Sequence, residues 1–124
     1  MSIASSKLSN NLQILDRKRF VTRCMGNQNL ANKLIGKLLD TLPVDKDALK
    51  SAIELSDFCE VSRIAHRLQG TASNICAELM SEAACQVEQA AKDNKLDLVG
   101  KNWVSLKGHI DALIRELKLG AKLE

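Results

Sequence analysis

The chain has 124 residues, 45% of them hydrophobic, and a formal net charge of +3 from 18 basic and 15 acidic residues. This length suits one domain with one core, and the mixed charge excludes a dedicated nucleic-acid binder, which would carry a basic stripe. Two residues are Phe, one is Trp and none is Tyr, and there is a single proline, so aliphatic side chains must fill the core. Because Leu and Ala favour helices and strand-forming residues are scarce, the composition predicts an all-α domain.

Location and redox state are predicted from features that the sequence lacks. No apolar run approaches the roughly 20 residues that cross a bilayer. Residues 1–11, rich in Ser and Asn, have no apolar centre of the kind that a signal peptide needs. The cysteines form no C-x-x-C pair: they are Cys24, Cys59, Cys76 and Cys85. We therefore expect a cytoplasmic, monomeric domain without direct membrane contact, with reduced and mostly buried thiols.

The N-terminal part of the chain is predicted to contain a tail and a short helix. Residues 1–11 are expected to be a flexible tail and residues 12–122 a helical bundle. The first helix is expected from about Leu12 to Cys24, because a Gly-Asn pair follows as a helix stop. Its basic residues are expected to form a solvated face: Arg17, Lys18, Arg19 and Arg23.

Two further helices are predicted on either side of Pro43. A stripe of leucines favours a helix over about residues 29–42, and Pro43 is expected to end it because proline cannot continue a helix interior. Asp45 then stands where an N-cap is wanted, ahead of a third helix that reaches about Ile53. The stripe consists of Leu30, Leu34, Leu38 and Leu42.

Three longer helices complete the chain. Asp57 and Glu60 resemble a capping box that opens a helix to about Ser73, and a fifth helix covers about residues 77–92. The sixth carries apolar residues at alternating spacings of three and four: Leu96, Val99, Trp103, Leu106, Ile110, Leu113 and Leu117. Because short connections favour antiparallel neighbours, we expect an up-down antiparallel four-helix bundle with two short N-terminal helices.

The helix predicted after Asp57 has an unusual face. Its apolar residues share one arc: Phe58, Val61, Ile64, Ala65, Leu68 and Ala72. His66 falls on the opposite side, and its neighbours there at helical spacing are small: Cys59, Ser62, Gly70 and Ser73. Solvated faces are normally built from Lys, Glu and Gln, so an imidazole among small side chains marks a candidate functional site.

Gly70 strengthens that interpretation. A glycine inside a helix costs about 1 kcal/mol relative to alanine, and this one lies one turn from His66 on the same face. The missing side chain leaves room beside the imidazole for a bulky group or an approaching partner. The alternative is that Gly70 only lets two helices pack closely and that His66 is an idle surface histidine.

The segment from Ala65 to Ala77 reads A-H-R-L-Q-G-T-A-S-N-I-C-A. It resembles the motif of histidine-containing phosphotransfer (HPt) domains, roughly A-H-x-L-K-G-x-A-x-x-I/L-G-A. In that family L-E-x-A follows on the next helix, and residues 87–91 read V-E-Q-A-A here. The helices before the motif and the long last helix also fit, so the resemblance covers about residues 12–119.

By this resemblance His66 is the phosphoacceptor and Gly70 keeps its face open. A neutral imidazole nitrogen is a competent nucleophile near neutral pH. The resemblance implies that the partners are receiver domains, of response regulators or of a hybrid histidine kinase. It implies no cofactor and no autonomous catalytic site: Mg²⁺ is expected on the receiver, and if the domain comes from a hybrid sensor kinase, the parent chain would be the kinase.

Two positions depart from the family pattern. The lysine three residues after the histidine is Gln69 here, which keeps a hydrogen-bond donor but loses the charge. The glycine before the last alanine is Cys76, so Asn74, which tolerates left-handed geometry, is expected to cap the helix instead. The first departure leaves an alternative function open: an HPt-like adaptor that docks receiver or kinase domains without accepting phosphate.

Supporting roles are predicted for residues around the motif. Glu88 stands where some family members place a Gln or Glu that reaches the other imidazole nitrogen; the alternative is a plain surface residue. Lys92 either supplies the charge that Gln69 lacks or forms half of an ordinary Glu–Lys helix pair. Partner docking is assigned to the flanks of the histidine: Cys59, Ser62, Arg63, Arg67 and Ser73.

No metal site is predicted. Cys59 and His66 share a face, but two ligands do not make a zinc site, and Cys24 and Cys85 have no partner spacing. His109, the other histidine, interrupts no apolar position of the last helix, so it is expected to be solvated.

Overall fold

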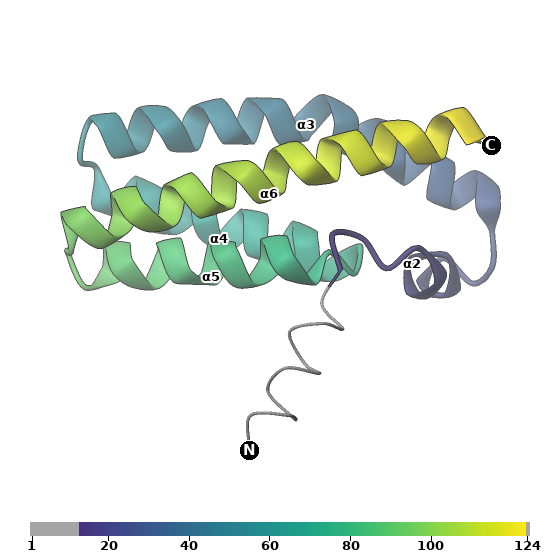
Figure 1. Ribbon diagram of the computed structural model, residues 1–124, viewed down its shortest axis with the longest axis horizontal. Coiled ribbons are helices and arrows are strands. Elements are labelled where there is room, and N and C mark those ends of the chain that lie inside the picture. Colours follow the sequence, from purple (N-terminus) through teal and green to yellow (C-terminus); the bar gives the residue numbers. More distant parts are fainter. Residues whose placement is uncertain (1–12, 124) are drawn as a thin grey trace, which may run out of the picture.

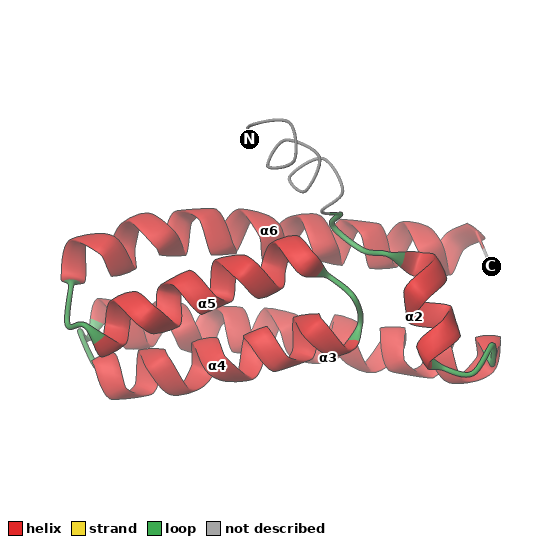
Figure 2. Cartoon of the chain, turned by 90° about the horizontal axis from the view of Figure 1, so that it is seen from below, coloured by secondary structure: helices red, strands yellow, loops and turns green. Residues whose placement is uncertain are grey.

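The computed structural model describes residues 13–123, and every regular element in this part of the chain is an α-helix (Figures 1 and 2). The elements are α2 (Arg17–Arg23), α3 (Gln28–Glu54), α4 (Phe58–Asn74), α5 (Glu78–Lys92) and α6 (Leu96–Leu123). Helices α3 to α6 lie side by side, each antiparallel to the one before it (Figure 1). The all-α prediction is confirmed, and the predicted tail over residues 1–11 lies outside the described residues.

The prediction that Pro43 ends a helix is wrong. Pro43 lies inside α3, so the two helices predicted around it are one helix of 27 residues, and α2 is the single short helix before it among the described residues. Proline costs a helix interior about 3 kcal/mol. Leu42 and Leu49, on either side, are fully buried, whereas Pro43 faces solvent. Core packing of Leu42 and Leu49 outweighs the local cost, and Asp45 is a mid-helix residue instead of an N-cap.

Only half of the predicted capping box at the start of α4 forms. The Asp57 carboxylate accepts a hydrogen bond from the backbone N–H of Glu60 at 3.2 Å, which fixes the first turn of the helix. The Glu60 side chain, however, accepts hydrogen bonds from Arg63 instead of reaching back to the backbone of Asp57. The cap therefore sets where α4 begins and leaves Glu60 on the exposed surface of the helix.

The turn between α4 and α5 is built on Cys76. This residue has a φ of 62°, the left-handed conformation that usually requires glycine. Its N–H bonds to the carbonyl of Ser73 at 3.2 Å, and the N–H of Ala77 bonds to Ala72 at 2.8 Å, the pattern of a Schellman motif. Asn74, predicted to be the cap, is instead the last residue of α4. The Cys76 side chain is 2% exposed, and this burial offsets the backbone strain of about 1–2 kcal/mol.

The core lies between the four long helices. On α6 the predicted seam is buried from Val99 onward, with Trp103 partly buried, but Leu96 is 52% exposed. On α5 most of the buried residues are alanines: Ala83, Ala84, Ala90 and Ala91. Because the separation of two packed helices depends on the side chains at their contact, these small residues favour close packing of α5 against its neighbours.

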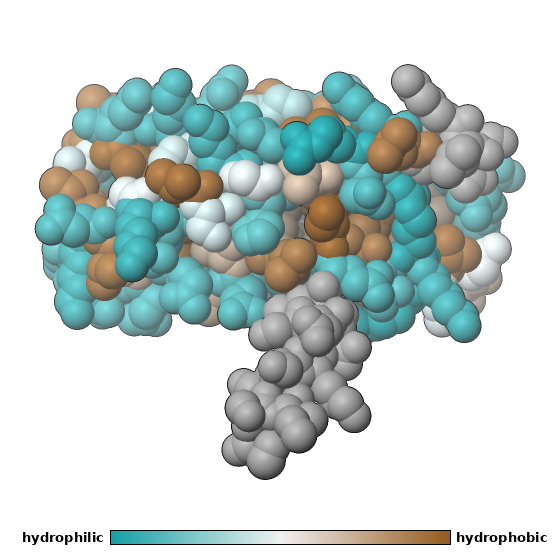
Figure 3. All heavy atoms as spheres, viewed as in Figure 1, coloured by the Kyte–Doolittle hydropathy of each residue, from teal (hydrophilic) through white to brown (hydrophobic). Residues whose placement is uncertain are grey.

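Helix α2 covers one end of the bundle. Helices α3 and α6, with 27 and 28 residues, are longer than α4 and α5, with 17 and 15. α2 lies across the overhanging end, with Phe20 and Cys24 buried (Figure 2). It begins at Arg17, after the N-cap Asp16, later than the predicted Leu12. None of the described helices combines the length and apolar character needed to cross a membrane. On the face shown in Figure 3, apolar side chains are scattered among hydrophilic ones.

Candidate phosphoacceptor site

Helix α4 presents its apolar arc to the core and His66 to the outside. Five side chains of the arc are at most 1% exposed: Val61, Ile64, Ala65, Leu68 and Ala72. The side chain of His66 is 72% exposed. The core contacts fix the rotation of the helix about its axis, so the imidazole is held where another protein can reach it.

Glu88 of α5 holds one nitrogen of that imidazole. Nδ1 of His66 lies 3.2 Å from Oε1 and 3.1 Å from Oε2 of Glu88. In the neutral ring Nδ1–H donates to the carboxylate, which leaves the lone pair on Nε2. Nε2 has no hydrogen-bond partner within the described part of the chain. Glu88 is only 8% exposed, so it is not the plain surface residue of the alternative interpretation.

Lys92 binds the same carboxylate. Its Nζ lies 3.0 Å from Oε2 of Glu88, one helical turn away. Burial raises the pKa of Glu88, but hydrogen bonds from Lys92 and His66, together with their charges, outweigh burial and hold this pKa below its ordinary value of 4.5. A buried, ionised carboxylate thus joins the ammonium group to the imidazole.

Open space surrounds Gly70. A Cβ atom built there would meet no heavy atom within 4 Å, and the residue is exposed. The alternative that this glycine serves close packing of two helices is therefore wrong. Its missing side chain instead leaves the surface beside His66 flat.

On the side of α4 that faces α3, two arginines have carboxylate partners of their own. Arg63 binds Glu60 on α4, and Arg67 binds Asp45 of α3 at 2.9 Å. The hydrogen bond from Arg63 lowers the pKa of Glu60, and the charges of Arg63 and Arg67 lower it further. Both arginines are exposed, but neither partner carboxylate touches the imidazole. Asp45 was missed as a partner because its register depends on α3 continuing through Pro43.

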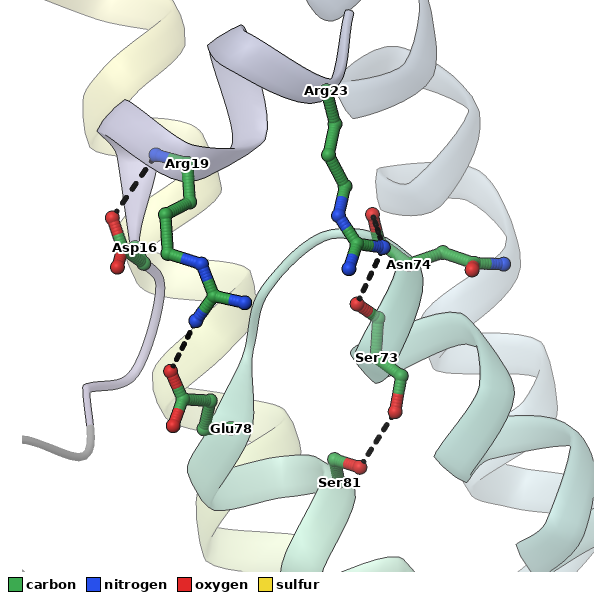
Figure 4. A network of polar contacts seen from close by, with 7 residues as sticks. All are labelled: Asp16, Arg19, Arg23, Ser73, Asn74, Glu78 and Ser81. Carbon is green, nitrogen blue, oxygen red and sulfur yellow. Dashed lines mark hydrogen bonds and ion pairs between the residues drawn. The ribbon is translucent and has the colours of Figure 1, made fainter. Parts of the chain in front are cut away.

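The other candidate residues lie along the exposed side of α4. Cys59 and Ser73 are exposed, and Ser62 and Gln69 are partly buried. Gln69 and Ser73 line a polar hollow between α4 and α5 that Ser81 also lines. The hydroxyl groups of Ser73 and Ser81 are 2.9 Å apart (Figure 4). The structure thus brings a hydrogen-bonding amide within one turn of the imidazole, on the α5 side.

Three of the four basic residues of α2, namely Lys18, Arg19 and Arg23, are exposed as predicted and Arg17 is partly buried, but the arginines also make contacts that were not predicted. Arg17 donates to the backbone carbonyl of Glu116, and Arg19 pairs with Glu78 at 2.8 Å. Arg23 donates to the carbonyl oxygens of the last two residues of α4, at 3.2 and 3.5 Å (Figure 4). The last carbonyls of a helix lack intrahelical partners and carry partial negative charge. α2 therefore fastens the end of the α4–α5 pair, a role that depends on the tertiary fold.

No group of three or more His, Cys, Asp or Glu side chains that could hold a metal ion occurs among the described residues. All four cysteines are free thiols. Cys24 and Cys76 are buried as predicted, whereas Cys59 and Cys85 are exposed. His109 is partly buried on α6 instead of fully solvated.

The chain is similar to several proteins of phosphorelay signalling. It is 33% identical over 75 residues to the sensor histidine kinase GacS of Pseudomonas protegens, a match that covers 60% of this chain and 8% of that kinase. The fold is similar to the HPT domain of a sensor hybrid histidine kinase from Shewanella, with a TM-score of 0.80 and 18% identity over 92% of this chain and 98% of that one.

Two further solved structures share the fold. Histidine-containing phosphotransfer protein B (HptB) of Pseudomonas aeruginosa has a TM-score of 0.82 and 15% identity, over 89% of this chain and 96% of that one. A putative histidine-containing phosphotransfer protein from rice has a TM-score of 0.75 and 16% identity, over 95% and 85%. The model of the Hpt domain family matches residues 33–117. The chain therefore belongs to the Hpt family, the histidine-containing phosphotransfer domains of two-component phosphorelays.

Proposed function

We propose that this domain carries a phosphoryl group on His66, which accepts it from the aspartyl phosphate of one receiver domain and passes it to the aspartate of another. The observation that carries the proposal is an imidazole 72% exposed whose Nδ1 is bound to a buried carboxylate, Glu88. The nucleophile must be exposed because its reaction partner belongs to another protein. It must also be oriented, because transfer requires Nε2 to face the phosphorus.

The proposed transfer step uses this geometry. The lone pair of Nε2 attacks the phosphorus of the aspartyl phosphate; a P–N bond forms while the P–O bond to the aspartyl carboxylate breaks, and that carboxylate takes the electron pair. Nδ1 keeps its proton, so the phosphorylated ring carries a positive charge. The Glu88 carboxylate, 3.1 Å from Nδ1, stabilises this charge. The onward step to a second receiver uses the same atoms in reverse.

The receiver is expected to contribute the rest of the chemistry. Phosphoryl transfer depends mostly on positioning and on neutralising charge. In this proposal the receiver supplies Mg²⁺, and the present chain needs no cofactor of its own. We further propose that the chain acts as a monomer in the cytoplasm. The exposed side of α4 is the docking surface, with Cys59, Ser62, Arg63, Arg67 and Ser73 around the histidine.

An apolar groove lies beside the last turn of α4. It lies between α2, α3 and α4, has a volume of about 490 Å³ and is lined by no carboxylate. Leu30 and Leu34 of α3 are 42% and 38% exposed in it. We expect a receiver that covers His66 to bury part of this apolar surface as well.

A labelled receiver tests the proposal. A receiver phosphorylated with radioactive phosphate should transfer acid-labile label to the wild-type domain, and addition of a second, unphosphorylated receiver should remove that label. His66→Ala should accept none, yet remain folded, because the side chain makes no core contact and such substitutions usually change stability by about 0.5 kcal/mol or less. His109→Ala, which removes the other histidine, should accept label as the wild type does.

Label on His66→Ala would contradict the assignment. Binding of the receiver without any label on the wild type would favour the adaptor, the alternative to which the uncharged Gln69 points. A melting temperature of His66→Ala lowered by roughly ten degrees would show that the side chain is structural.

A further inference from the structure

The carboxylate that contacts the imidazole is buried, whereas the lysine bound to it is largely exposed. The side chain of Glu88 is 11% exposed, and that of Lys92 is 58% exposed. A lysine carries its charge on a flexible four-carbon chain, so its ammonium group changes partners without any movement of the backbone. Of the two side chains, the exposed Lys92 is therefore the one that has room to change partners.

Both groups bind one oxygen of Glu88. Oε2 lies 3.0 Å from Nζ of Lys92 and 3.1 Å from Nδ1 of His66. While the ring is neutral, Lys92 supplies the only full positive charge on this carboxylate among the described residues. A ring that becomes positively charged competes with Lys92 for the same oxygen.

The other cationic groups near His66 are engaged elsewhere. Arg63 binds Glu60, and Arg67 binds Asp45, so each is neutralised by a carboxylate that does not contact the imidazole. Gln69, where the family pattern has lysine, is uncharged. A phosphoryl group on Nε2 would bring a charge of about −1.5 to −2 next to this network.

We propose that phosphorylation of His66 makes Glu88 exchange partners: the positively charged ring takes the carboxylate, and Lys92 leaves it to bind the phosphoryl oxygens. This inference rests on the proposed function for its natural trigger. No proton moves and no covalent bond changes in the exchange itself. Each negative group then has a cation beside it both before and after transfer. Lys92 then supplies the positive charge that the family pattern has at position 69, where this chain has Gln69.

The experiment loads the phosphoryl group without a receiver. Phosphoramidate transfers its phosphoryl group to imidazole with loss of ammonia, so the free domain is phosphorylated chemically and followed by ³¹P NMR as a function of pH. A neighbouring ammonium group favours the dianionic phosphoryl form and lowers its pKa. We therefore expect the pKa of the phosphoryl group to be higher in Lys92→Met by roughly half a unit, and close to the wild-type value in Lys92→Arg.

Lys95→Met is the matched control. Lys95 is exposed in the turn after α5 and binds no carboxylate among the described residues, so its loss should leave the phosphoryl titration unchanged. In the wild type the ammonium resonance of Lys92 should move on phosphorylation. A phosphoryl pKa identical in the wild type and Lys92→Met, or a stationary ammonium resonance, would show that Lys92 remains on Glu88 and would overturn the inference.

Failure of the proposed function has a different signature. If the receiver transfers no label to His66, but the chemically loaded domain shows the Lys92-dependent titration, the relay is wrong and the exchange of partners stands. If transfer from the receiver is normal and Lys92→Met titrates like the wild type, the relay stands and the exchange is wrong.

Discussion

The two flanks of His66 carry similar charged groups in different arrangements. On the α5 flank, Glu88 is buried and binds both the imidazole and Lys92. On the α3 flank, Arg63 and Arg67 are bound to carboxylates that do not reach the imidazole. The difference teaches that the residue types and their distance along the helix do not decide which charges act on the histidine. A shared, buried partner does.

The pKa directions of the two flanks show the same contrast. The pKa of Glu60, whose side chain is 40% exposed, is lowered first by its hydrogen bond from Arg63. The pKa of Glu88 is raised by burial and lowered below its ordinary value only because Lys92 and His66 both bind it. Removing a partner of Glu88 therefore has consequences at the imidazole, whereas removing a partner of Glu60 affects an exposed pair that solvent screens.

The largest effect is expected at Gly70, which lies one helical turn from His66 on the same face of α4. Gly70→Leu should remain folded, because a Cβ there meets open space and leucine favours a helix by up to about 1 kcal/mol. The branched side chain would keep a partner away from His66. Because a displacement of about 1 Å can cost a hundredfold in rate, transfer from a phosphorylated receiver should slow by roughly that factor.

Single-turnover transfer measures this effect, and Gly108→Leu on α6, where a Cβ also meets nothing within 4 Å, controls for the glycine replacement itself. Chemical loading by phosphoramidate should be affected much less, since that donor is small. Equal transfer rates in Gly70→Leu and the wild type would mean that no partner approaches over this glycine.

Glu88→Gln tests the α5 flank. The amide oxygen still accepts a hydrogen bond from Nδ1, but the negative charge that stabilises the phosphorylated ring is gone. A hydrogen bond to a charged group is worth about 1 kcal/mol more than a neutral one, so the equilibrium share of phosphoryl on His66 should fall roughly five-fold. The partition of label between the domain and one receiver gives this share.

Glu60→Gln is the corresponding change on the α3 flank, and it should leave that share unchanged. A similar loss in both variants would show that the long-range charge of α4 and α5, and not the shared contact, controls the imidazole. This pair of variants therefore tests the comparison of the flanks directly.

The helical wheel of α4 carried enough information to place His66 and its small neighbours outside, because one run of buried residues fixes the rotation of the helix. The caps and breakers were less reliable. Proline at position 43 is tolerated because Leu42 and Leu49 are buried on either side. Cys76 adopts a left-handed conformation because its side chain is buried. In both cases tertiary packing outweighed a local preference.

The partners of the charged residues were harder to predict. The Glu88–Lys92 pair is local, at helical spacing, and was visible as one of two possibilities. Asp45 and Arg67 come from different helices, and their register depends on α3 being continuous. The contacts of Arg23 with the end of α4 depend on where α2 crosses the bundle. Such pairings require the three-dimensional arrangement.

A smaller effect is expected from Gln69→Lys, which restores the charge of the family pattern. A charged donor binds a phosphoryl group better than a neutral one, but solvent screens an exposed contact, so about 0.5–1 kcal/mol is expected. The share of label on His66 should rise roughly two- to five-fold, more at low ionic strength than at high.

The measurement is the partition of label at two salt concentrations. Glu82 lines the same hollow as Gln69. A share that does not change, or that falls, would mean that a lysine at position 69 pairs with Glu82 or that Lys92 already supplies the charge.

Acid should weaken the contacts of Glu88 on the α5 flank, and the free energy of unfolding should fall as a result. Because the pKa of Glu88 is lower in the folded chain than its ordinary 4.5, the ionised form favours folding at neutral pH. That contribution is complete above about pH 4.5 and is lost as the pH falls through the folded-state pKa. The wild type should therefore lose stability relative to Glu88→Gln as the pH drops below 4.5, and the difference in their free energies of unfolding should change in favour of the variant.

Chemical denaturation at several pH values measures this difference. The same series on Glu60→Gln should show a smaller trend, because that carboxylate is exposed. A pH-independent difference for Glu88→Gln would mean that the carboxylate gains nothing from Lys92 and His66 on folding.

The smallest effect is expected on the α3 flank, from the pair Arg67–Asp45. The side chains are 44% and 19% exposed, and the pair joins α4 to α3 at 2.9 Å. Exposed ion pairs contribute about 0.2–1 kcal/mol, so a double-mutant cycle with Arg67→Ala and Asp45→Ala should give a coupling energy in that range, reduced by salt.

Phosphoramidate should load His66 equally in all four proteins, because neither group touches the imidazole. Receiver binding is the sensitive readout: Asp45→Ala frees Arg67 for an acidic partner and should tighten binding, whereas Arg67→Ala should weaken it. A change in chemical loading upon loss of either group would mean that the α3 flank also acts on His66, and the distinction between the flanks would fail.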